Sequence, residues 1–106
     1  MNDEPVTFNT VTEKLLSETA LFHWHDLQKF FAQGVVLWVD ESLDLVSVAS
    51  MFANDDSNQL EPLLEALKIR QPTNDQARQW YGDDVELWSV VVAPYVLVQE
   101  FAENKK

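Results

Sequence analysis

Two histidines, His23 and His25, flank Trp24 and precede Asp26. A His-x-His pair can bind a metal ion from a β-strand, because residues i and i+2 of a strand point to the same face. On a helix the same two side chains point about 200° apart and cannot share an ion. The spacing of the surrounding apolar residues favours a helix. We therefore expect two surface or half-buried histidines that hold no metal.

Carboxylates form two short clusters, Asp40, Glu41 and Asp44 in one and Asp55 and Asp56 in the other. A calcium loop needs oxygen ligands at alternating positions and usually a glycine at its turn. Acid–base catalysis by paired carboxylates needs an enclosed site that shifts one pKa. Neither segment has these features, so we expect the carboxylates to cap helices and to solvate the surface.

Other catalytic signatures are missing from the sequence. The absence of cysteine excludes disulfides, thiolate zinc sites and cysteine nucleophiles. Ser47, Ser50 and Ser89 lack the glycines of a nucleophile elbow. The only glycines, Gly34 and Gly82, cannot form a glycine-rich phosphate loop. We expect no catalytic residue, no cofactor and no metal ion, and a protein that is not an enzyme.

The composition describes one acidic domain with a real core. The 106 residues are 46% hydrophobic, and 18 acidic against seven basic residues give a net charge of −11. Nucleic acids and anionic membranes are disfavoured as partners, because positive charge dominates affinity for phosphate. The longest nearly apolar run, residues 90–98, is far shorter than the roughly 20 residues that span a bilayer. We expect a cytoplasmic protein whose partner, if any, is a basic protein.

The first third of the chain should be mainly helical. Residues 1–9 are expected to form a loose arm, and Thr10 or Thr12 can cap the helix that follows. Apolar residues then recur at steps of three and four up to Phe31. This spacing predicts either one helix over Val11–Gln33 or two helices that break near His23, with Gly34 as the stop.

A buried strand and two helices are predicted next. Residues 35–39 are five apolar residues typical of a central strand. Ser42 is the expected N-cap of a helix containing Leu45 to Ala53, and Asp44 adds favourable charge in its first turn. A second helix is expected from Asn58, with a capping box to Glu61 and Pro62 near its first turn.

The last third should contain a short helix between extended segments. An extended segment over Lys68–Gln71 precedes a capping box at Thr73 and Gln76, and the helix should run to about Trp80 and stop at Gly82. Residues 87–92 predict a strong strand. Pro94 either bends this strand, separates two strand segments or starts a final helix.

Together these elements predict a single α+β domain over residues 10–99, followed by a frayed tail over residues 100–106. About four helices should pack on a small, mainly antiparallel sheet of three or so strands. Trp24, Trp38 and Trp88 are assigned to the core. Trp80 and the neighbouring Tyr81 are the best candidates for an exposed interface, because they lie on a short helix.

Several segments resemble a family of small, uncharacterised bacterial proteins. The similar segments are LDLVSVA at 43–49, LWSVVVAPYVLVQ at 87–99, FFAQG at 30–34 and TNDQARQW at 73–80. The resemblance extends from Glu13 to Gln99. It implies a bacterial source and a domain of unknown function, and it assigns no catalytic or binding residue.

The order of the elements is also similar to that of a winged helix-turn-helix. The candidate recognition helix, residues 58–68, carries Glu61 and Glu65 and has its one basic residue, Lys68, at the end. A recognition helix places base-contacting residues in its first turns. Direct DNA binding is therefore not expected, although a degenerate winged-helix regulator or an acidic nucleic-acid mimic is a hypothesis.

The leading functional hypothesis is a non-enzymatic, acidic protein-interaction or regulatory module. Its interface candidates are Trp80, Tyr81, Glu61 and Glu65. A small enzyme or ligand binder that uses carboxylates and histidine in a cleft is the alternative. A homodimer is a further hypothesis, because a small valine-rich sheet leaves an edge open.

Overall fold

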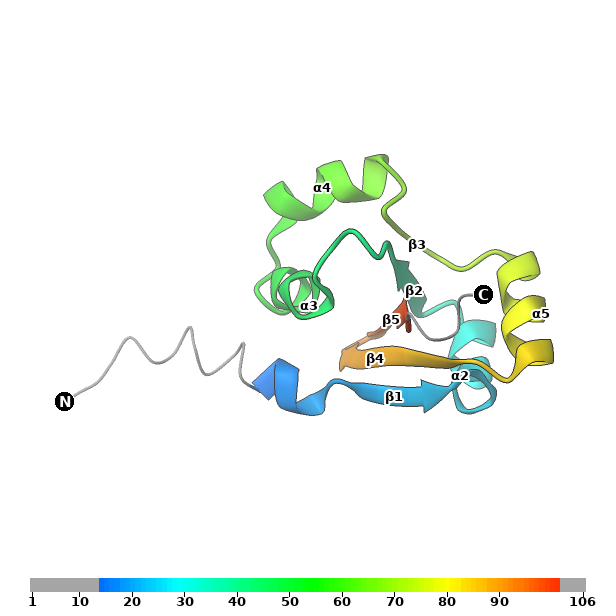
Figure 1. Cartoon of the computed structure of the whole chain (residues 1–106). Helices are drawn as coiled ribbons and strands as arrows, with labels where there is room; N and C mark the ends of the chain where they lie inside the picture. The colour runs from blue at the N-terminus through cyan, green and yellow to red at the C-terminus, as the bar shows by residue number, and fades with distance from the viewer. Residues whose placement is uncertain (1–13, 102–106) are drawn as a thin grey trace.

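The computed structural model describes residues 14–101 of the chain (Figure 1). Residues 14–18 are helical. The elements that follow are β1 (Ala20–His23), α2 (Trp24–Ala32), β2 (Val36–Val39), α3 (Leu45–Ala53), α4 (Ser57–Glu65), β3 (Ile69–Arg70), α5 (Asn74–Asp83), β4 (Glu86–Val92) and β5 (Tyr95–Glu100). The predicted arm, its capping threonines and most of the predicted tail lie outside the described residues.

The strands form one five-stranded sheet in the order β1-β4-β5-β2-β3. Only β2 and β5 are parallel, and the other three neighbouring pairs are antiparallel. The predicted α+β class and mainly antiparallel sheet are confirmed. The sheet has five strands where about three were expected. β2 is internal as predicted, but β5 and not β2 occupies the middle of the sheet.

Helices cover both faces of the sheet, because successive residues of a strand point to opposite sides. In β5, Leu97 belongs to a core cluster with residues of α3 and α4. Val96 and Val98 belong to a second cluster with residues of α2 and α5. The pairs α3–α4 and α2–α5 therefore lie on opposite faces of the sheet (Figure 1).

A strand interrupts the predicted N-terminal helix. β1 pairs with β4, and the Trp24 N–H donates to the Val85 carbonyl oxygen at 2.9 Å. The alternative of two helices with a break near His23 is the correct one, since α2 starts at Trp24. The strand itself was missed because the helical spacing of the apolar residues continues through it, and strand pairing overrides that local preference.

Two helix starts differ from prediction. Asp44, not Ser42, is the N-cap of α3, and its carboxylate accepts from the Ser47 N–H at 2.9 Å. α4 begins at Ser57 with Asp56 as its N-cap, so the expected box starting at Asn58 is not used. The carboxylates were better acceptors for the free N–H groups than the residues chosen from spacing alone. Pro62 lies inside α4 and beyond its first turn.

The start of helix α5 agrees with the sequence prediction, and its end does not. Thr73 and Gln76 form the predicted capping box. The helix continues through Gly82 to Asp83, and Asp84 takes the left-handed C-cap conformation with φ of 50°. Gly82 is therefore not the stop. Gly34, in contrast, follows α2 with φ of 79° and ends that helix as predicted.

Pro94 separates two strands. β4 and β5 pair antiparallel from Val92 and Tyr95 onward, and residues 93–94 form the turn between them with a cis peptide bond. This hairpin occupies the middle of the sheet, so it is not a peripheral wing. β5 continues to Glu100, one residue into the predicted tail. No helix within residues 14–101 is long and apolar enough to cross a membrane.

Candidate functional site

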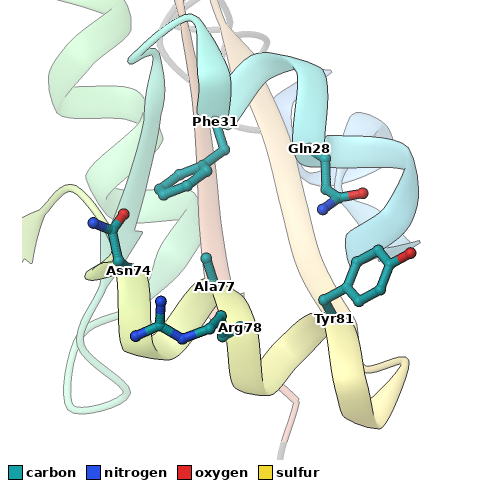
Figure 2. A pocket seen from close by; sticks show the side chains of 6 residues that line it. All are labelled: Gln28, Phe31, Asn74, Ala77, Arg78 and Tyr81. Carbon is teal, nitrogen blue, oxygen red and sulfur yellow. The ribbon is translucent and has the colours of Figure 1, made fainter.

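A groove of ≈ 570 Å³ lies between α2 and α5. Its lining residues are Gln28 and Phe31 from α2 and Asn74, Ala77, Arg78 and Tyr81 from α5. In Figure 2 Phe31 extends from α2 toward α5, and Gln28 and Tyr81 lie at one end of the groove. Asn74 and Arg78 lie toward the other end.

Two buried tryptophans hold the helices on the sheet. Trp24 of α2 and Trp80 of α5 are edge to face, with ring centroids 5.0 Å apart. Trp24 also packs edge to face against Phe31, at 5.4 Å. Consecutive helical residues point about 100° apart. Because Trp80 faces the core, the next residue, Tyr81, is directed outward to the groove.

Tyr81 is 53% exposed and is held by His25. The two ring centroids are 4.5 Å apart, and His25 Nε2 lies within hydrogen-bond distance, 3.2 Å, of the Tyr81 carbonyl oxygen. The ring contact leaves the phenol at the surface, where it presents a large apolar ring and a hydroxyl. Tyr81 is therefore suited to contact a partner.

Both histidines approach Asp84, contrary to the expectation that they diverge. His23 ends β1 and His25 lies in the first turn of α2, and their Nδ1 atoms are 3.4 and 3.9 Å from Asp84 Oδ1. His23 Nε2 also lies 3.6 Å from Glu86 Oε2. Within residues 14–101, no group of histidines and carboxylates has the arrangement of a metal site. The cluster connects the β1–α2 junction to the turn between α5 and β4.

The groove combines an apolar floor with hydrogen-bonding walls. Phe31 and Ala77 supply apolar surface, and the carboxamides of Gln28 and Asn74 can each donate and accept hydrogen bonds. The Arg78 guanidinium forms an ion pair with Asp75 in the preceding turn. Side chains that donate and accept in this way match the N–H and C=O groups of a polypeptide backbone.

Four carboxylates and two cations lie on, or directly after, the two helices that form the groove. The carboxylates on α2, on α5 and directly after α5 are Asp26, Asp75, Asp83 and Asp84, and the cations are Lys29 and Arg78. These six groups carry two more negative than positive charges, although the one charged residue that lines the groove itself is the cation Arg78.

The structure does not bring the predicted interface residues together. Trp80 is only 3% exposed, because α5 packs on the sheet through it, and this position rules it out as a surface contact. Tyr81 remains at the surface. Glu61 and Glu65 are exposed on α4, which packs on the opposite face of the sheet. One interface cannot contain both Tyr81 and the α4 pair.

The assignment of three tryptophans to the core is correct for Trp24 and wrong for Trp88, which is 36% exposed. Trp88 lies on the α3 side of β4, beside Leu21, and its ring is nearly perpendicular to that of Phe101, with the centroids 5.8 Å apart. Trp38 is half-buried, with the Arg70 guanidinium 4.2 Å from its ring centroid.

The remaining lining residues were missed, although the sequence contained a signal for them. Asn74, Ala77, Arg78 and Tyr81 are spaced i, i+3, i+4, i+7 and so form one stripe of α5. Gln28 and Phe31 have the matching i, i+3 spacing on α2. The pattern defines each stripe, but only the fold shows that the two stripes face each other.

The fold and the groove define a small α+β domain with an interhelical cleft. The chain belongs to the family described as "Protein of unknown function (DUF2288)", whose model matches residues 10–100. The resemblance to an uncharacterised family is therefore confirmed. A similar solved structure is the NMR solution structure of PA1075 from Pseudomonas aeruginosa. It is 40% identical over 100% of this chain and 98% of that chain, with a TM-score of 0.77. No curated protein matches the chain.

Proposed function

We propose that the protein is a non-enzymatic interaction module that binds a basic polypeptide segment in the α2–α5 groove. The observation that supports this most strongly is the lining of the groove. It joins an apolar floor at Phe31 and Ala77 to the carboxamides of Gln28 and Asn74. The side chains that line it favour recognition of a peptide over acid–base or nucleophilic chemistry.

The carboxylates on and next to α2 and α5 are the reason for proposing a basic segment. Asp26, Asp75, Asp83 and Asp84 lie on or next to the two helices that form the groove, within a chain of net charge −11. A lysine- or arginine-rich segment would gain favourable long-range attraction and faster association. The same field opposes nucleic acid, so the proposed partner is a basic protein.

The proposal also places the protein in the cytoplasm of a bacterium. Its support is the relative in Pseudomonas aeruginosa and a cysteine-free sequence that suits a reducing compartment. Self-association belongs to the proposal as well, through a surface that shares no lining residue with the groove.

A random dodecapeptide library displayed on phage tests the groove. We expect the immobilised protein to enrich peptides that combine lysine or arginine with apolar residues. Synthetic copies of these peptides should bind more weakly at high salt, because salt screens the attraction. The variants Tyr81→Ala and Gln28→Ala should each weaken binding about tenfold, or about 1.4 kcal/mol.

Leu64→Ala is the control, since Leu64 is an exposed apolar residue of α4 on the other face of the sheet. It should leave peptide binding unchanged. The proposal is wrong if the library yields no enriched peptides, if the enriched peptides are acidic, or if Tyr81→Ala and Leu64→Ala weaken binding equally.

A further inference from the structure

The two edges of the sheet differ in how well they are protected. β3 forms one edge with only two residues and is followed closely by Pro72, a residue that cannot donate to a ladder. β1 forms the other edge with four residues. It carries no lysine and no proline, and its register with β4 is unbroken by a bulge. An edge strand that lacks lysine, proline and a bulge can pair with a strand of another molecule.

The pairing of β1 with β4 shows which backbone groups face outward. The Trp24 N–H donates to the Val85 carbonyl oxygen, directly across the extended register of the two strands. Residues alternate between bonded and non-bonded pairs in an antiparallel ladder. Ala20 and Phe22 therefore bond to β4, whereas the N–H and C=O groups of Leu21 point away from the sheet.

The neighbours of Leu21 restrict the register of an incoming strand. The Thr19 N–H is already used, because it donates to the Leu16 carbonyl oxygen at 3.2 Å. The His23 carbonyl belongs to the N-cap of α2, where it accepts the first bond of the helix. Within residues 14–101, the groups left for a partner are the N–H and C=O of Leu21, the N–H of His23 and the C=O of Thr19.

We propose that two copies of the chain pair antiparallel through β1, with Leu21 opposite the partner's Leu21. In this register each Leu21 N–H donates to the carbonyl of the partner's Leu21. Each His23 N–H donates to the carbonyl of the partner's Thr19. All the outward groups are used, and the two sheets become one continuous sheet about a two-fold axis.

The side chains of this register are also complementary. Leu21 lies opposite Trp88 in β4, so the pairing creates a row of Trp88, Leu21 and the same two residues of the partner on one face. On the other face Phe22, which is 43% exposed, lies opposite the small side chain of the partner's Ala20. The pairing thus covers apolar surface on both faces of the edge.

The distribution of charge favours a second copy of the chain as the partner of the β1 edge. Residues 19–22 carry no charged side chain in a chain of net charge −11. A basic partner would be attracted to the carboxylates elsewhere, whereas two like-charged copies need an uncharged strip in which to meet. A contact of one short strand buries little area, so we expect a dissociation constant on the order of tens of micromolar.

Sedimentation equilibrium of the full chain tests the pairing. We expect a monomer–dimer equilibrium that strengthens with salt, because salt screens the repulsion between the copies. The variant Phe22→Lys should weaken it at least tenfold. Leu64→Lys is the matched control, since it makes the same change of charge at 41% exposure on α4 and should leave dimerisation unchanged. Circular dichroism verifies that both variants are folded.

Cysteine scanning tests the register, because the chain has no native cysteine. Leu21→Cys should form a disulfide with its own copy on mild oxidation, at a Cα separation of about 5.5 Å. Ala20→Cys should cross-link to Phe22→Cys in a mixture and poorly to itself. Leu64→Cys should remain uncross-linked.

The proposal is overturned by a monomer at all concentrations up to millimolar, or by equal cross-linking at positions 21 and 64. Slow amide exchange at Leu21 in a monomer would also overturn it, since a segment of the same chain would then occupy the edge. The groove proposal is tested separately, because peptide binding weakens with salt whereas this dimer strengthens.

Discussion

Trp80 and Tyr81 are adjacent residues with opposite roles, and this difference gives a sharp prediction. Trp80 is 3% exposed and packs edge to face against Trp24, which is fully buried. Removing a buried aromatic side chain typically costs about 3–5 kcal/mol. A domain of this size is stabilised by about 5–15 kcal/mol. Trp80→Ala should therefore lose a large part of the free energy of unfolding.

Tyr81→Ala should cost far less. Tyr81 is 53% exposed, and its replacement by alanine removes the ring contact with His25. Aromatic pairs contribute about 0.5–1.5 kcal/mol, so a loss near the lower end, about 0.5–1 kcal/mol, is expected at this exposed site. Peptide binding should nevertheless fall in Tyr81→Ala and persist in a folded Trp80→Phe variant.

Urea unfolding followed by far-ultraviolet circular dichroism measures both effects without relying on tryptophan fluorescence. The milder Trp80→Phe keeps an aromatic ring in the core and should lose roughly 1–2 kcal/mol, which guards against a Trp80→Ala variant that does not fold. The reasoning is refuted if Tyr81→Ala is as destabilising as Trp80→Ala, or if Trp80→Phe abolishes peptide binding while Tyr81→Ala leaves it intact.

Two further predictions concern α2 and α5. Thr73→Ala removes the capping box with Gln76 and should cost about 1 kcal/mol in urea unfolding; no loss would contradict the role of the cap. The two glycines should respond to alanine with opposite signs. Gly34→Ala should cost about 1–2 kcal/mol, because φ is 79° there, even though an added Cβ would lie 3.6 Å from Gln71. Gly82→Ala should stabilise by about 0.5–1 kcal/mol, because Gly82 lies within α5 and an added Cβ meets nothing within 4 Å. Changes of the same sign at both glycines would contradict these assignments.

Local signals predicted the elements that depend on nearby residues. The capping box at Thr73, the stop at Gly34 and the strand at residues 36–39 all follow from short sequence patterns. β1 was not predictable in this way, because its formation depends on pairing with β4, more than sixty positions later in the chain. The exposure of Trp88 was missed for a related reason, since only the placement of α3 determines which part of β4 is covered.

In the candidate site, too, local sequence patterns predict single elements but not how the elements meet. The helical spacing of the stripe from Asn74 to Tyr81 is visible in the sequence. Only the fold shows that α2 lies opposite this stripe and completes the groove. The sequence makes Trp80 an interface candidate because it lies on a short helix. The helix is in fact longer, and Trp80 anchors it to Trp24 on the sheet. Glu61 and Glu65 were correctly placed on a helix but lie on the opposite face from Tyr81.

The most direct test of the account maps the amide chemical shifts of the protein while a basic peptide selected from the library is added. We expect shifts concentrated in residues 28–31 and 74–81, which are abolished by Tyr81→Ala and reduced at high salt. Shifts concentrated instead around Glu61 and Glu65 on α4, or along β1, would contradict the assignment of the α2–α5 groove as the binding site.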